Sequence, residues 1–245
     1  MYLFSTVNGS KYKGDVWKMK ISEVKLNVHD LHKMKEFYCD KLGFELLEQA
    51  EHFFEIAAGE SNILFERIDS TIDKQYHFAF NIPSNLFQQA KKWVQERVEI
   101  LRADEQDEVY FEFLDAYACY FYDPEDNIIE FIARQGINPK VSTNAFSIQH
   151  VLNIAEINLT TDAILTVAER LKEYGITPLK DEEIRTDALT FMGNYEDGVH
   201  LLIGPSERMW YFSTKKAIVS PIEIRVDDHL QLCVSVNGEF AISHL

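Results

Sequence analysis

Three side chains that can bind a metal ion stand at the same place in three similar stretches of the chain: Glu23, His77 and Glu156. Each begins a run in which polar and apolar residues alternate, which is the pattern of a half-buried strand. Glu130 lies in a further alternating run between isoleucines, where a carboxylate needs a partner because an unpaired buried charge is costly. A metal ion is one such partner, since carboxylate oxygens and imidazole nitrogens both bind divalent ions.

The stretch that begins at Glu23 predicts a strand, a helix and three further strands. Asp30 is a good N-cap, apolar residues follow it at helical spacing, and Gly43 suits the left-handed residue that ends a helix. Strand-like runs come next at residues 44–49, 53–59 and 62–68. These elements form a βαβββ module.

The same order recurs from His77 and again, in part, from Glu156. In the second copy Ser84 occupies the N-cap position, and strands continue to residue 133. The third copy has a helix closed by Gly175 and two strands at 189–195 and 199–204. Repetition at this scale indicates that the fold is built from repeated structural modules.

Short alternating runs near the carboxyl end predict a small antiparallel meander. They are IEIRV, LQLCVSV and EFAIS, and Asn237-Gly238, a strong hairpin signal, separates the last two. Residues 1–19 precede the modules and are open to two interpretations, an edge strand or a loose segment.

Composition excludes several classes of partner. The chain carries 24 basic and 40 acidic residues, a formal charge of -16, which repels phosphate backbones and anionic lipid. No apolar run approaches the ~20 residues of a membrane span, and the amino terminus lacks the apolar region of a secretory signal. Three scattered cysteines, with no CxxC pair, fit reduced thiols. We therefore expect a cytoplasmic protein that binds neither nucleic acid nor membranes.

Residues 21 to 134 resemble the vicinal oxygen chelate superfamily, which includes glyoxalases, bleomycin-resistance proteins and extradiol dioxygenases. The stretch VKLNVHDLHKMKEFYCDKLGFEL is similar to the family's opening strand, helix start and "FY-x-x-x-LGF" helix end. The stretch YFYDPEDNIIEF is similar to its "DP-x-G-N-x-x-E" closing hairpin, with Asp126 in place of the glycine. The resemblance implies an α+β fold in which paired βαβββ modules form a curled, cup-like mixed sheet around a divalent metal.

With a third module and the meander added, four segments are expected. Residues 1–20 are an N-terminal segment, 21–134 a vicinal oxygen chelate domain of two modules, 135–145 a linker, and 146–245 a partial third module with the meander. A single module leaves a half-open sheet, and exposed sheet edges are normally covered. The third module is therefore expected to pair in a homodimer or to be completed by the meander.

The family's ligand positions, carried over residue by residue, fall on Glu23, His77 and Glu130. Two carboxylates and one imidazole suit iron, manganese, zinc, nickel or cobalt and leave positions open for a bidentate substrate. The glyoxalase type adds a fourth ligand, but its place here falls at Leu64 or Glu66, which does not support that assignment.

Tyr120 lies ten residues before Glu130, as a catalytic tyrosine does in the extradiol dioxygenase branch, although strand packing is an alternative role. His200 could join Glu156 but is expected to be structural, and Trp210 is expected to be a packing or interface aromatic.

Two functions from different classes stay open. The first is a metal-dependent enzyme, such as a lyase, isomerase, epimerase or dioxygenase, that acts on a small molecule with neighbouring oxygens. The alternative is a metal-free protein that binds a drug or metabolite in a cup lined by Tyr110, Phe111, Tyr120 and Tyr122, as the bleomycin-resistance branch suggests. A cup that has lost its ligand, in a protein that mainly assembles, is a third possibility.

Overall fold

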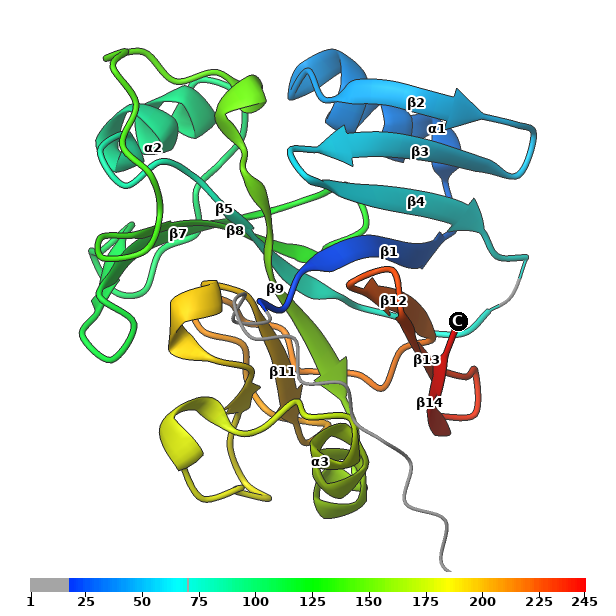
Figure 1. Ribbon diagram of the computed structural model, residues 1–245. Helices are drawn as coiled ribbons and strands as arrows, with labels where there is room; N and C mark the ends of the chain where they lie inside the picture. The colour runs from blue at the N-terminus through cyan, green and yellow to red at the C-terminus, as the bar shows by residue number, and fades with distance from the viewer. Residues whose placement is uncertain (1–17, 70) are drawn as a thin grey trace, which may run out of the picture.

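The computed structural model describes residues 18–69 and 71–245, which form three helix-containing modules and a terminal meander (Figure 1). The first module comprises β1 (Ile21–Val28), α1 (Leu31–Lys35), its π-helical continuation η1 (Glu36–Lys41), β2 (Glu45–Gln49), β3 (Phe53–Ala58) and β4 (Ser61–Arg67). The second comprises β5 (His77–Asn81), α2 (Phe87–Gln95), β6 (Val109–Phe111), β7 (Ala116–Tyr122) and β8 (Ile128–Arg134). Residues 1–17, including the possible edge strand, lie outside the described part of the chain.

The third module and the meander follow. The third comprises the short helix η2 (Ile148–His150), β9 (Asn153–Thr160), α3 (Ile164–Glu173), η3 (Leu179–Asp181), β10 (Thr190–Met192), η4 (Tyr195–Asp197) and β11 (His200–Gly204). The meander comprises β12 (Ile222–Val226), β13 (Leu230–Val234) and β14 (Phe240–His244). Among the helices of the described residues, none combines the length and the apolar character needed to cross a bilayer.

The strands form two mixed sheets, and the modules pair differently from the expected arrangement. Sheet A has the order β14-β13-β12-β1-β4-β3-β2, and sheet B has the order β10-β11-β9-β5-β8-β7-β6. The second module thus shares a sheet with the third, through antiparallel β5 and β9, and the first module shares a sheet with the meander, through β1 and β12. The α+β fold of curled, paired modules is confirmed, but the predicted boundaries at 21–134 and 146–245 do not coincide with the two sheets.

This pairing has consequences for the other expected segments. Residues 135–145 connect two strands of the same sheet, and within them Asn138 is buried and donates a hydrogen bond to Asn81 Oδ1 at 3.1 Å. The half-open edge of the third module, which suggested a homodimer, is covered by β5 of the same chain. Sheet B lies, in sequence, between the two parts of sheet A.

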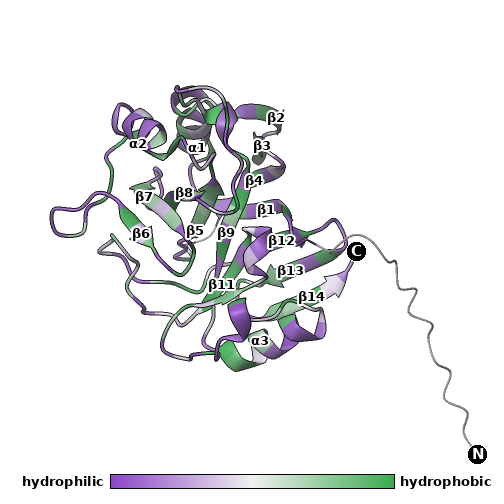
Figure 2. Cartoon of the chain, turned by 60° about the vertical axis from the view of Figure 1, so that its left-hand side comes forward, coloured by the Kyte–Doolittle hydropathy of each residue, from purple (hydrophilic) through white to green (hydrophobic). Residues whose placement is uncertain are grey.

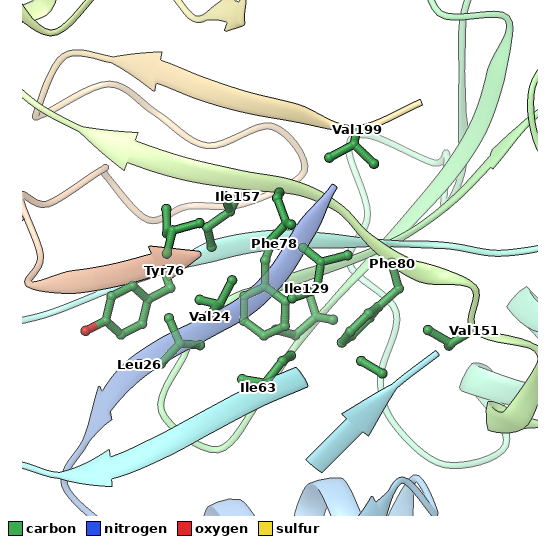
Figure 3. Close-up of a cluster of buried hydrophobic side chains, with 14 of the residues drawn as sticks. Val24, Leu26, Ile63, Tyr76, Phe78, Phe80, Ile129, Val151, Ile157 and Val199 are labelled. Atoms are coloured by element: carbon green, nitrogen blue, oxygen red, sulfur yellow. The ribbon is translucent and has the colours of Figure 1, made fainter. Parts of the chain in front are cut away.

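The two sheets pack back to back through their apolar faces (Figure 3). Val24 and Leu26 of β1 and Phe78 of β5 are each at most 1% exposed, and they meet in this core. The predicted alternation is therefore confirmed: Phe78 faces the core, and its neighbour His77 faces the other side of sheet B. In Figure 2, β11 of sheet B is mainly hydrophobic, whereas the sequence of β9 alternates between hydrophobic and polar residues. The faces that point away from this core carry the ionisable side chains.

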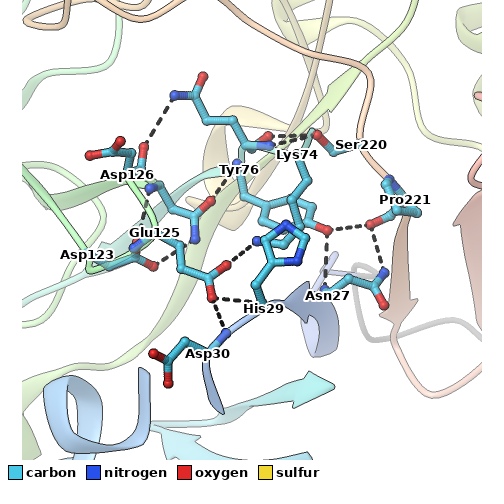
Figure 4. A network of polar contacts seen from close by, with 12 residues as sticks. Asn27, His29, Asp30, Lys74, Tyr76, Asp123, Glu125, Asp126, Ser220 and Pro221 are labelled. Carbon is cyan, nitrogen blue, oxygen red and sulfur yellow. Dashed lines mark hydrogen bonds and ion pairs between the residues drawn. The ribbon is translucent and has the colours of Figure 1, made fainter. Parts of the chain in front are cut away.

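The hairpin at the start of β8 sets the register between β8 and β5 (Figure 4). Asp123 Oδ1 accepts the backbone N–H groups of Glu125 and Asn127 at 2.9 and 3.0 Å. Asn127 Oδ1 accepts the backbone N–H of Tyr76 at 2.9 Å, directly before His77. Asp126 takes the left-handed conformation, with φ 61°, in place of the family's glycine. The hairpin motif thus ties the position of His77 to that of β8.

The same hairpin also ties sheet B to the first helix (Figure 4). The Glu125 carboxylate accepts the backbone N–H groups of His29 and Asp30 at 2.8 and 2.7 Å and pairs with Lys74. Asp30 in turn accepts the backbone N–H of Lys33 at 3.0 Å, which confirms its predicted N-cap role. Both sheets are therefore anchored beside the start of β5.

Candidate metal centre

Three ionisable side chains from adjacent strands converge on the outward face of sheet B. They are His77 of β5, Glu130 of β8 and Glu156 of β9, and one ligand atom of each lies within 4.8 Å of the others. His77 Nε2 is 3.5 Å from Glu130 Oε2. Three ligands around one ion at ~2.1 Å can be at most ~4.2 Å apart, so a shift of a few tenths of an ångström would suffice. All three residues are at most 5% exposed.

His77 is held in the tautomer that a metal ligand needs. Its Nδ1 lies 3.0 Å from the carbonyl oxygen of Ile128, and because a carbonyl can only accept, Nδ1 carries the proton. The lone pair of Nε2 therefore points into the cluster, as in histidines oriented by a second hydrogen bond. Burial, assisted by the positive charge of Arg208, lowers the pKa of His77 to about 4. The imidazole is neutral at neutral pH.

Glu130 has an oxygen without a partner. Among the described residues, nothing forms a hydrogen bond with its Oε1, although this atom is buried. Burial, with the charge of Glu156 adding to it, raises the pKa of Glu130 well above its usual range. Burial therefore favours a proton on Glu130 in the metal-free protein, and a bound cation would displace that proton. A buried acceptor of this kind fits a site for a positively charged ligand.

Glu156 is already bound to a guanidinium. Arg134 of β8 forms an ion pair with its Oε1, and both side chains are at most 3% exposed. Burial raises the pKa of Glu156, and the Arg134 charge opposes this rise. Arg134 Nη2 also lies 3.4 Å from Nδ1 of His200, whose pKa is lowered to about 3 by burial and then by Arg134. His200 is adjacent to the cluster but not part of it.

A cavity of about 150 Å³ opens beside these residues. Its walls include the three cluster residues and side chains from the segment between β11 and β12, which lies over the concave face of sheet B. The remaining lining is mostly aromatic or aliphatic: Phe111, Phe113, Leu114, Tyr120, Ile128, Leu189, Phe191, Leu202, Trp210 and Tyr211, with Arg208. The site is thus a small, largely apolar chamber with an ionisable floor.

Two aromatic side chains form the part of the cavity wall next to the cluster. The Trp210 ring lies 4.9 Å from the His77 ring, and its Nε1 donates to Gln75 Oε1 at 2.9 Å. Trp210 therefore forms a wall of the cavity, in addition to packing. Tyr120 lies opposite Glu130 on the neighbouring strand, and its ring stacks on Phe212 at 5.3 Å.

Of the aromatic residues expected to line the cup, Phe111 and Tyr120 do so. Tyr110 is 44% exposed, and its hydroxyl donates to Asp115 Oδ1 at 2.6 Å. Tyr122 forms a hydrogen bond with Ser213 Oγ at 2.7 Å, outside the lining of this cavity.

The structure brings His77 and Glu130 together, but it does not bring Glu23 to them. Glu23 lies in sheet A, where its Oε2 accepts a hydrogen bond from Arg225 Nη1 at 3.1 Å. The three module starts do share one register, as the repeat implied, but β5 pairs with β9 and not with β1. Glu156 therefore occupies the place expected for Glu23.

The alternating charges of β1 and β12 are the sequence signal that indicates the true pairing. Glu23 lies opposite Arg225, and Lys25 lies opposite Glu223. The fourth ligand position of sheet B is apolar: Leu202 lies opposite Asn158, as Glu130 lies opposite Ala79. The cluster accordingly has three members.

Comparison with known proteins agrees with this architecture. The family model described as "Toxoflavin-degrading enzyme" matches residues 154–208, from β9 to the segment after β11. No curated protein matches the chain. A proposed dioxygenase from Bacillus subtilis matches with a TM-score of 0.55 and 14% identity, over 76% of this chain and 63% of its own.

Smaller solved structures match about half of the chain. An integron cassette protein from the mobile metagenome of the Halifax Harbour sewage outfall is 25% identical, with a TM-score of 0.40, over 46% of this chain and 97% of its own. A lactoylglutathione lyase from Agrobacterium tumefaciens is 19% identical, with a TM-score of 0.37, over 46% of this chain and 91% of its own. The likeness to the Bacillus protein concerns the fold, and the chain has the vicinal oxygen chelate fold that its motifs implied.

Proposed function

We propose that the chain is a divalent-metal-dependent enzyme that acts on a small molecule with neighbouring oxygen atoms, with His77, Glu130 and Glu156 as the metal ligands. The observation that carries the proposal is the fixed tautomer of His77, which directs a free lone pair at two buried carboxyl groups. One imidazole and two carboxylates suit iron(II), manganese, zinc, nickel or cobalt. When bound, such an ion supplies a Lewis acid that polarises a substrate oxygen.

The side chains around the ligands have distinct tasks in this proposal. Tyr120 lines the cavity beside Glu130, and burial, followed by the charges of Glu130 and Glu156, raises its pKa well above the usual range. Its phenol stays protonated and can donate a hydrogen bond or a proton to a substrate oxygen. The apolar walls exclude water from that oxygen and strengthen the polar contacts inside. Tyr120 is thus the proposed catalytic residue.

The partial family match supports an enzymatic function. It covers the part of the chain that contains Glu156 and the cavity residues Leu202 and Arg208. These residues belong to the same chamber as the proposed ligands. The substrate and the bond that changes stay open.

A metal-free binding protein is the second candidate, and the ion pair of Glu156 with Arg134 favours it. That pair gives one of the two carboxylates a cation without any metal. The apolar walls could then hold a small ligand by burial alone. Ligand-induced stabilisation that does not depend on a metal would support this candidate.

Metal content tests the proposal. Protein prepared without a nickel column is stripped with a chelator, loaded separately with Mn(II), Fe(II) or Zn(II), and analysed by mass spectrometry. We expect stoichiometric binding in the wild type and in the matched variant Glu23→Gln, and loss of binding in His77→Gln. Thermal melting of each variant checks that it folds. A wild type that takes up no ion, or a His77→Gln variant that binds as well as the wild type, would reject a metal site here.

The cytoplasmic location and the homodimer stay predictions as well. Sedimentation of the purified chain tests the second of these.

A further inference from the structure

Arg208 stands apart from the other arginines of this acidic chain. Its side chain has no carboxylate within ion-pair distance among the described residues. Every other arginine lies within 4.0 Å of a carboxylate: Arg67, Arg97, Arg102, Arg134, Arg170, Arg185 and Arg225. With 40 acidic residues in the sequence, an arginine left without one has another reason for its position.

The Arg208 guanidinium is held at the cavity instead of extending into solvent. It lies 4.2 Å from the centre of the Trp210 ring, a cation–π contact, and its Nη1 donates to the backbone oxygen of Met209 at 3.0 Å. Its Nε and Nη2 are buried and have no partner among the described residues. Burial lowers the pKa of Arg208 to about 10, so the group is still charged at neutral pH. A fixed cation with two free donors is ready for an anion.

The charges around the cavity also favour an anionic ligand. Glu130 and Glu156 supply two negative charges when both are ionised, and Arg134 and Arg208 balance them. Because the two arginines already balance the two carboxylates, a divalent ion in the cluster would give these groups a net positive charge. No further described side chain of the cavity neutralises that charge. Buried charge without compensation is unfavourable, and the ligand is the component that can supply the missing negative charge.

Building on the proposed function, we infer that Arg208 binds the anionic group of the substrate, and that the substrate is a small single-ring aromatic or heteroaromatic acid. A guanidinium matches the two oxygens of a carboxylate with two parallel donors. The walls include Phe111, Phe191 and Tyr211, which suit a planar ring. A volume of about 150 Å³ is that of a cavity able to hold one benzene-sized ring.

Benzoate and benzamide test this inference, because the two have nearly the same shape and differ in charge. Their affinities are measured by calorimetry on chelator-treated protein, so that Arg208 is tested without a metal. We expect benzoate to bind about tenfold or more tightly than benzamide in the wild type. In Arg208→Gln the affinity for benzoate should fall to that for benzamide, and the affinity for benzamide should stay unchanged. The control Arg185→Gln, which alters an exposed arginine paired with Asp187, should behave as the wild type.

Three outcomes would overturn the inference: no preference for benzoate, a preference that survives in Arg208→Gln, or no binding of either compound. Metal uptake, measured on the same samples, keeps the two proposals apart. An Arg208-dependent preference in a protein that binds no metal would refute the metal-dependent function and leave an anion-binding cavity. Metal uptake without a preference for benzoate would refute the anion-binding role of Arg208 and leave the metal-dependent function standing.

Discussion

Sheets A and B share one arrangement of paired strands, but the side chains at equivalent positions have different surroundings in the two sheets. By register, Glu23, Leu64 and Glu223 of sheet A correspond to His77, Glu130 and Glu156 of sheet B. In sheet A both carboxylates face basic side chains: Glu23 lies 3.1 Å from Arg225, and Glu223 lies 3.2 Å from Lys25. These groups are between 25% and 47% exposed, whereas the side chains of His77 and Glu130 are 6% and 3% exposed.

The difference arises from what covers each sheet. The segment between β11 and β12 closes the cup of sheet B with Arg208 and Trp210, but the ionisable face of sheet A is open to solvent. Charges in water interact weakly, and desolvated charges shift their pKa values and demand partners. Similar ionisable residues thus form a surface ladder in sheet A and a candidate site in sheet B.

The largest contrast is expected in stability. Glu156→Gln removes the carboxylate that forms the ion pair with the buried Arg134, which should lower the free energy of unfolding by about 3–5 kcal/mol. The counterpart Glu223→Gln removes a partly exposed partner of Lys25 and should cost about 1 kcal/mol or less. Urea unfolding in the presence of a chelator measures both. Equal losses would mean that the two sheets do not differ in the way described.

The second-largest difference between the two sheets is expected in the effect of substitutions on metal affinity. Glu130→Gln removes a proposed ligand and should weaken Mn(II) binding by at least about 100-fold, since even outer-shell changes cost up to that factor. Glu66→Gln, which alters a sheet A carboxylate 2.7 Å from Lys25, should leave the affinity unchanged. Equilibrium dialysis gives both values. A matching loss in the two variants would point to a general charge effect in place of a defined site.

The pH dependence of stability sharpens the contrast for Glu130. Because its pKa is raised in the folded protein, the unfolded chain loses this proton first as pH rises above about 4.5. The stability of the metal-free wild type should therefore fall relative to Glu130→Gln, by up to about 1.4 kcal/mol per pH unit, until the folded pKa is reached. His77 and His200 titrate in both proteins and largely cancel in the difference. Saturation with Mn(II) should abolish this slope, and a metal-free difference that is flat with pH would show that Glu130 is not protonated.

The smallest effect concerns the cover of sheet B. Trp210→Phe removes the hydrogen bond to Gln75 and should cost about 1 kcal/mol. Because the Trp210 ring lies 4.9 Å from His77, Mn(II) should quench the tryptophan fluorescence of the wild type and of Trp93→Phe, but much less that of Trp210→Phe. Unchanged quenching in Trp210→Phe would place the ion elsewhere.

Local signals in the sequence predict the individual elements well. The alternation that separates His77 from Phe78 is present in β5, and Gly43 has the predicted positive φ of 82°. Gly238 also has a positive φ, of 79°, in the turn of the predicted last hairpin. Ser84 is an exception: the chain turns once more after it, Leu86 N–H donates to the Pro83 oxygen, and α2 begins only at Phe87.

The pairing of the modules could not be derived in the same way. Glu23, His77 and Glu156 occupy equivalent positions in their strands, so period and register give no preference for one pair over another. The choice depends on contacts far apart in sequence, such as Glu23 with Arg225. Arg208 belongs to an irregular segment, and its place in the cavity follows from the tertiary path of that segment.

The order of the strands along the chain, with sheet B between the two parts of sheet A, also matters during synthesis of the protein. Every strand of sheet B has been synthesised once Gly204 is added, but β1 must wait for β12, where Ile21 meets Val226. At the ~5–20 residues per second of translation, roughly 8–31 s separate the emergence of β4 and β12 from the ribosome. Throughout that interval one edge of β1 has no neighbour. A nascent chain arrested before residue 222 would thus carry a complete candidate site beside an aggregation-prone strand edge.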